Sequence, residues 1–96
     1  MNRLILSAAL VERGVLRYTP AGLPALDLQL KHESELMEDG VARKVLMELR
    51  AVAIGAITQA LGSMALGEAG LFGGFLAAAR NGRGVLFHIT SVEPLA

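Results

Sequence analysis

The sequence contains no cysteine and no tryptophan, and its two histidines, His32 and His88, lie far apart in the chain. Without cysteine, the chain has no disulfides, thiolate metal sites or cysteine nucleophiles. A zinc site would need carboxylates at ligand spacing around a histidine, and no such spacing occurs. We interpret both histidines as satisfied or partly buried side chains. The expectation is therefore no metal, no cofactor and no enzymatic activity.

Net charge is also missing, because nine basic residues balance nine acidic ones. Bulk charge therefore gives no argument for nucleic acid or for a membrane surface as a partner. Aromatic residues are scarce, with one tyrosine and three phenylalanines, so the core must be mainly aliphatic. A length of 96 residues suits one domain and not two, and we expect a single domain over residues 1–96.

No hydrophobic run is long enough for a convincing membrane span. The charge-free segment 51–67 has 17 residues and includes three polar residues and three glycines, whereas a spanning helix needs about 20 apolar residues. Residues 4–11 are apolar as in a signal peptide, but Glu12 and Arg13 follow where a cleavage site would be expected. We expect a cytoplasmic protein that has no membrane partner.

Alternation of apolar and polar residues predicts the strands of the first half. Residues 3–13 are mostly apolar and predict a strand that is buried on both faces. Residues 25–34 alternate cleanly and predict a half-buried strand. Residues 20–24 suit a tight connection, so these two strands should pair antiparallel. The acidic Glu35, Glu38 and Asp39 are assigned to an exposed loop that leads to a third strand, residues 42–54.

The second half begins with a change of period. Ile57, Ala60 or Leu61, and Met64 have helical spacing and predict one short helix within residues 55–66. Residues 68–80 predict a strand in which Gly73-Gly74 marks a bulge or a close approach of another backbone. Asn81-Gly82 predicts a hairpin that leads into a last strand at residues 85–93.

The predicted order is three strands, a helix and two strands. In an all-β chain this order is typical of the five-stranded Greek-key barrel called the OB-fold, with one short helix between strands three and four. An open α+β sandwich with the same order is the alternative.

Short stretches spread along the chain resemble the single-stranded-DNA-binding protein superfamily and, within it, the PriB family of primosomal replication proteins. The stretches are Asn2 to Ser7, Pro20 to Pro24, Leu30 to His32, Gly73 to Phe75, and Asn81-Gly82 with Val85 to His88. The resemblance implies an OB-fold homodimer without enzymatic activity. It also implies binding to single-stranded DNA, and help in reloading the replicative helicase at stalled forks with the primosomal helicase and other primosome proteins.

Three features depart from the family pattern. Leu46 stands where relatives carry an aromatic residue, Glu33 stands at a position that is basic in relatives, and the loop 79–84 has two cations instead of a lysine-rich stretch. These departures support an alternative function, a protein-interaction module of the primosome with weak or residual DNA binding.

The candidate DNA contacts are cations that would track phosphates and one leucine that would lie against a base. They are Arg17, Arg43, Lys44, Leu46, Arg50, Arg80 and Arg83. Each has a simpler interpretation, because strand faces and hairpin tips often carry charge for solubility alone. A homodimer is expected also because the apolar first strand would leave an exposed edge in a partly closed barrel.

Overall fold

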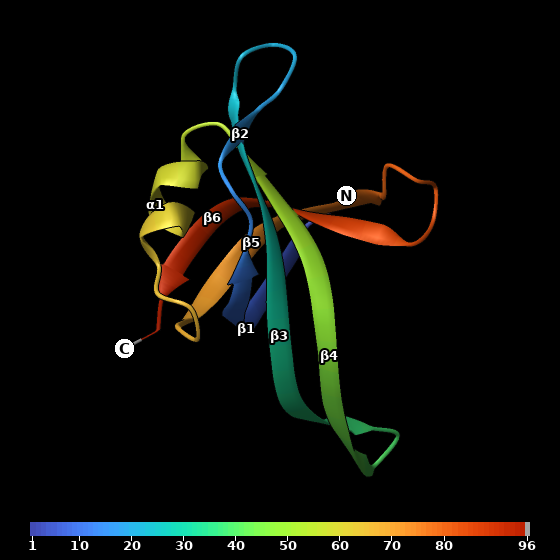
Figure 1. Cartoon of the computed structure of the whole chain (residues 1–96). Helices are drawn as coiled ribbons and strands as arrows, with labels where there is room; N and C mark the ends of the chain where they lie inside the picture. The colour runs from blue at the N-terminus through green and yellow to red at the C-terminus, as the bar shows by residue number, and fades with distance from the viewer. Residues whose placement is uncertain (96) are drawn as a thin grey trace.

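The structure is a computed structural model that describes residues 1–95, and it contains one short helix among strands (Figure 1). The elements are β1 (Leu4–Arg13), β2 (Arg17–Tyr18), β3 (Pro24–Glu38), β4 (Val41–Ile54), α1 (Ile57–Ser63), β5 (Ala69–Ala78) and β6 (Val85–Pro94). The strand order is β1-β5-β6-β4-β3-β2, and an additional pairing of β1 with β3 closes a barrel. The pairing of β4 with β6 is parallel, and the other pairings are antiparallel.

The closed barrel of five strands with α1 between β4 and β5 is the predicted OB-fold, and the prediction is confirmed. The open sandwich is wrong because β1 pairs with β5 on one side and with β3 on the other. The two-residue β2 was not predicted. It pairs with the start of β3 across a tight turn in which Gly22 has a φ of 86°.

The core is mainly aliphatic, as the composition predicts. Its largest fully buried side chains are Phe72, Phe87, Leu10, Leu30, Leu61 and Ile89. Helix α1 covers one end of the barrel, where it contacts β3, β4 and β6. Leu61 and Met64 are buried and Ala60 is exposed, so Leu61, together with Thr58, forms the buried face of the helix.

Strand β1 corrects one prediction, because its first half is not buried on both faces. Ile5 is 54% exposed, while Ala8 and Leu10 are buried. Residues 4–8 pair with β5 alone, and β3 joins only at Ala9, opposite Lys31. In the described chain, one edge of β1 therefore has no partner strand over residues 4–8.

The predicted acidic loop after residue 34 is also wrong, because β3 continues to Glu38 and turns at Asp39-Gly40 into β4. From His32 onward, β3 pairs with β4 alone, in register from His32 with Met47 to Glu38 with Val41. Residues 32–47 therefore form a two-stranded projection, here called the arm, that extends beyond the barrel (Figure 1).

The predicted glycine bulge is confirmed in β5. The register between β5 and β6 shifts between Gly73 and Gly74. A Cβ atom on Gly74 would overlap the backbone carbonyl of His88, so only glycine allows the two backbones to approach this closely. Beyond the bulge, Phe75 is paired with His88.

Within residues 1–95, no helix reaches the length and apolar character that crossing a membrane requires.

Candidate nucleic-acid interface

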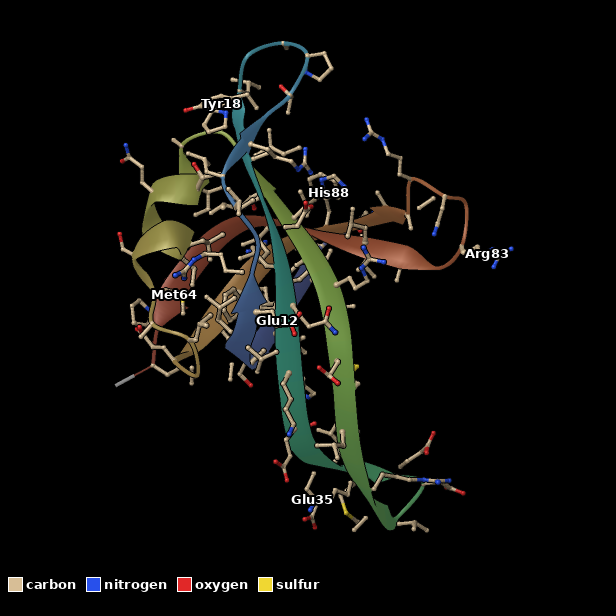
Figure 2. All side chains as sticks on the ribbon, in the orientation of Figure 1. Glu12, Tyr18, Glu35, Met64, Arg83 and His88 are labelled. Atoms are coloured by element: carbon tan, nitrogen blue, oxygen red, sulfur yellow. The ribbon has the colours of Figure 1, made fainter. Side chains whose placement is uncertain are left out.

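A groove of about 750 Å³ runs across the outer face of β3, β4 and β6. The connection 14–23 borders it on one side, and the β5–β6 loop 79–84 borders it on another. Its charged and titratable lining residues are Arg17, Asp27, Arg50, Arg80, Arg83 and His88. Figure 2 shows Arg83 on the projecting loop and His88 nearer the centre of the molecule.

The groove brings together four of the candidate residues: Arg17, Arg50, Arg80 and Arg83. They come from β2, β4 and the β5–β6 loop, so the fold assembles what the sequence scatters. Asp27 is the one carboxylate among the described lining residues, and four cations less one anion leave a net charge of +3. A groove with this charge can hold a polyanion by its phosphates.

Arg17 and Asp27 form a two-pronged ion pair at the border of the groove. Arg17 Nε donates to Asp27 Oδ2 at 3.0 Å, and Arg17 Nη2 donates to Asp27 Oδ1 at 3.0 Å. The hydrogen bond from Arg17 lowers the pKa of Asp27, with a further contribution from the charges of Arg17 and Arg50, while partial desolvation opposes the shift. The same contact raises the pKa of Arg17. Arg17 is thus held in place, but Asp27 occupies its guanidinium.

The outer face of β4 continues from the groove onto the arm. Lys44, Leu46, Glu48 and Arg50 share this face, because they are opposite Glu35, Glu33, Lys31 and Gln29 of β3. Leu46 is 61% exposed, as predicted for an outward position. Arg50 lies four positions further along β4, a distance of about 13 Å. Lys44 Nζ lies 3.4 Å from Glu33 Oε1, so its charge is partly neutralised.

Arg43 is not brought together with the other candidates. It is adjacent to Lys44, so its side chain points to the opposite face of the arm. There Arg43 Nε lies 2.9 Å from Glu38 Oε1. Arg43 is therefore a member of the arm's ion pairs rather than of the groove.

Sequence reasoning missed the aromatic pair Phe75 and His88. Their rings are stacked with centroids 4.8 Å apart and an interplanar angle of 10°. His88 lines the groove, and within residues 1–95 its ring makes no hydrogen bond to protein. His32 differs, since Nδ1 lies 2.6 Å from the Ser7 carbonyl oxygen and Nε2 lies 2.8 Å from Ser34 Oγ. The interpretation as satisfied or partly buried histidines is confirmed for both, since His32 is hydrogen-bonded and His88 is partly buried.

A family described as "Another single-strand binding protein family" matches residues 2–91. The chain belongs to this family. The replication restart protein PriB of Bordetella pertussis is 50% identical over 80 residues, which cover 83% of this chain and 75% of that protein. PriB of Photorhabdus laumondii is 30% identical over 96 residues, which cover 96% and 91% of the two chains. The resemblance to the PriB family is therefore confirmed.

Solved structures agree with this membership. The structure of PriB from Ralstonia solanacearum matches with a TM-score of 0.89 and 39% identity, over 98% of this chain and 97% of that chain. The single-stranded DNA binding protein from Thermus aquaticus matches with a TM-score of 0.76 and 26% identity. That match covers 100% of this chain and 51% of the Thermus chain. This chain shares its fold with both of these proteins.

A signal for His88 was present in the sequence of this family member. Strict alternation in the last strand places Phe87 and Ile89 inside, which puts His88 outside. Its pairing with Phe75, however, depends on the bulge at Gly73-Gly74. The sequence predicts the bulge but not the register that the bulge imposes on the neighbouring strand.

Among the described residues, no group of three or more His, Cys, Asp or Glu side chains is arranged to hold a metal ion.

Proposed function

We propose that this chain binds single-stranded DNA in the groove, as an accessory protein of the replication-restart primosome that helps reload the replicative helicase at stalled forks. The observation that carries the proposal is the convergence of Arg17, Arg50, Arg80 and Arg83 in one groove of a barrel from the single-strand binding family. The role is one of binding without catalysis, in the cytoplasm, and it requires no cofactor.

The strand would run from the loop 79–84, over Arg50, towards Leu46. Guanidinium groups bind phosphate oxygens and release condensed counterions, so affinity falls with salt. With phosphate contacts from Arg50, Arg80 and Arg83, since Arg17 is engaged with Asp27, the logarithm of the affinity should fall by about 2 per tenfold rise in salt, as expected for single strands. Leu46 offers a base van der Waals contact without an aromatic face, so nothing here distinguishes one base from another.

The experiment is fluorescence anisotropy with labelled oligo-dT at low salt. Arg80→Ala/Arg83→Ala should weaken binding by more than tenfold and reduce the salt slope by about 1.4, because two phosphate contacts are lost. Arg43→Ala is the matched control, since Arg43 is paired on the opposite face of the arm. If oligo-dT does not bind at tens of micromolar, or if Arg43→Ala weakens binding as much as the double variant, the groove is not the site.

A homodimer is part of the proposal, supported by two surfaces that one copy leaves uncovered. The first is the free edge of β1 over residues 4–8. The second is the inner face of the arm, where Leu36 and Met47 continue the row of core residues into solvent. A second copy that pairs with the edge and covers the inner face would remove both.

The exposed tip of the arm favours a second candidate function, a protein-interaction module of the primosome. Met37 and Val41 are exposed there, and Arg43 and Lys44 are engaged with Glu38 and Glu33. An apolar tip with internally paired charges suits a protein partner, such as the primosomal helicase, better than it suits DNA. Helicase binding that survives in Arg80→Ala/Arg83→Ala would show that the two surfaces are separate.

A further inference from the structure

His88 lies on β6, the strand between β5 and β4 in the sheet. On one side it is paired with Phe75 of β5, and on the other with Val52 of β4. The Phe75 ring covers one face of the imidazole, and the bulge at Gly74 fixes the backbone of His88 against β5. What the imidazole offers the groove is therefore its remaining surface and its two nitrogens, which are not hydrogen-bonded to residues 1–95.

The charged groups around His88 are nearly all cationic. Arg50 faces it from β4, Arg17 and Asp27 from the β2–β3 side, and Arg80 and Arg83 from the loop 79–84. Helix α1 and strand β5 carry no titratable side chain. The other titratable residue of β6, Glu93, lines a different cleft beside β1. Asp27, the one carboxylate of the groove, is already engaged with Arg17.

A phosphodiester bound in the groove changes the charge around His88. The arginines of the groove attract phosphate groups electrostatically. A negative charge beside an imidazole favours its protonated form. Histidine is the side chain that changes charge between about pH 5 and about pH 8. A protonated ring has donors on both nitrogens and makes charge-assisted hydrogen bonds to phosphate oxygens.

We propose that His88, positioned by Phe75, contacts the DNA backbone in its protonated form, so that binding of single-stranded DNA is coupled to uptake of one proton from solvent. This proposal rests on the proposed function, because it needs the strand to lie in the groove. Proton uptake on binding makes the affinity for single strands rise as the pH falls from about 8 to about 6. For one linked proton, the rise is no more than about tenfold per pH unit.

The experiment measures oligo-dT affinity by anisotropy at fixed low ionic strength from about pH 5.5 to about pH 8, a range in which thymine does not titrate. The unaltered chain should bind several-fold more tightly near pH 6 than near pH 8. His88→Asn should flatten this profile, because asparagine does not change charge in this range. The matched control is His32→Asn, which removes the other histidine of the chain, away from the groove, and should keep the pH dependence.

Phe75→Leu tests the positioning role, since it removes the stacked ring and keeps an apolar side chain. It should reduce the pH dependence without abolishing affinity near pH 8. NMR titration of the histidine Cε1–H signals of the unaltered chain avoids any folding defect of a variant. The His88 titration midpoint should move to higher pH when oligo-dT is bound, and the His32 signal should not follow it.

Three results would overturn the proposal and leave the proposed function intact. The first is binding to oligo-dT that depends on salt but not on pH. The second is a pH profile that His88→Asn leaves unchanged. The third is a His88 midpoint that DNA does not move. Absence of oligo-dT binding at every pH would overturn both proposals together.

Discussion

Asp27 has a double role, because it orients Arg17 and also opposes DNA. Its carboxylate is the negative group of a groove with net charge +3, and it accepts from two of the five N–H donors of the Arg17 guanidinium. We expect Asp27→Asn to tighten binding to oligo-dT several-fold and to steepen the salt dependence, because Arg17 becomes available for one more phosphate. Asp39→Asn at the tip of the arm is the matched control. Equal binding by the two variants would show that Arg17 reaches no phosphate.

The same carboxylate predicts a dependence of stability on pH. Its pKa is lowered in the folded chain, chiefly by the hydrogen bond from Arg17. A lowered folded pKa contributes stability above the unfolded value, about 3.9, and this contribution is lost as the pH falls through the folded value. Both partners are largely solvent-exposed, so the effect is small. Thermal melts should show a difference between the unaltered chain and Asp27→Asn at neutral pH that shrinks below about pH 4.

Leu46 stands where an aromatic residue would give a base a stacking surface. Base–aromatic stacking contributes about 1–3 kcal/mol per base, so Leu46→Trp should tighten oligo-dT binding by about fivefold to about a hundredfold. The chain has no tryptophan, so quenching of the new indole reports contact directly. Leu46→Ala should cost much less stability than the 2–5 kcal/mol of a core leucine, since the side chain is exposed. A large loss of stability in the alanine variant would place Leu46 in an interface.

At the scale of elements, helix α1 depends on a residue of β1. Ala56 precedes the helix and provides no side-chain cap. At the other end, Arg13 Nη1 donates to the Leu61 carbonyl at 3.2 Å and to the Met64 carbonyl at 2.6 Å. These bonds satisfy carbonyl groups that the end of a helix leaves without partners.

We therefore expect Arg13→Met, which keeps the aliphatic length, to lower the free energy of unfolding by about 1–3 kcal/mol. Arg3→Met is the matched control, because Arg3 lies outside β1 and is exposed. Urea denaturation followed by circular dichroism measures both. A loss below about 0.5 kcal/mol for Arg13→Met would mean that water replaces the guanidinium at the helix end.

Elements differ in how far the sequence predicts them, and the reason is physical. The first part of β3, residues 24–33, is predictable because one face of a barrel strand faces solvent and the other faces the core. This makes apolar and polar residues alternate with a period of two. The last part of β3, residues 34–38, has no such period, because both faces of the arm are open to solvent. The predicted burial of β1 on both faces is wrong because its exposure depends on where β3 begins to pair with it, at Ala9. The local sequence does not determine that pairing.

The candidate site follows the same division. Arg17, Arg50, Arg80 and Arg83 were identifiable as cations at loops and on an outward strand face, and the fold gathers them in the groove. Arg43 was grouped with them through its neighbour Lys44, although consecutive strand residues point to opposite faces. His88 was passed over because its stacking on Phe75 depends on a register shift in β5.

At the scale of the whole molecule, the arm gives a small chain a long axis, with principal extents of 49 × 33 × 22 Å. Its inner face carries Leu36, and its outer face carries Met37; both are exposed in one copy. Light scattering should give about twice the chain mass of 10.1 kDa at micromolar concentration. Leu36→Asp should shift the population to monomer, and Met37→Asp should not. A mass near 10.1 kDa for the unaltered chain would exclude the dimer.

The closure of the barrel sets the order in which the chain can fold. The β3–β4 hairpin is local, and the chain contains all of it once Ile54 has been synthesised. The pairings of β1 with β5 and of β4 with β6 join segments far apart in the sequence. Pairings this distant in sequence slow folding to milliseconds or seconds in small β-barrels. A nascent chain that has not yet reached Val85 leaves the edge of β5 that β6 will occupy, and the parallel edge of β4, without partners. Until β6 emerges from the ribosome, these unpaired edges are exposed to pairing with other chains.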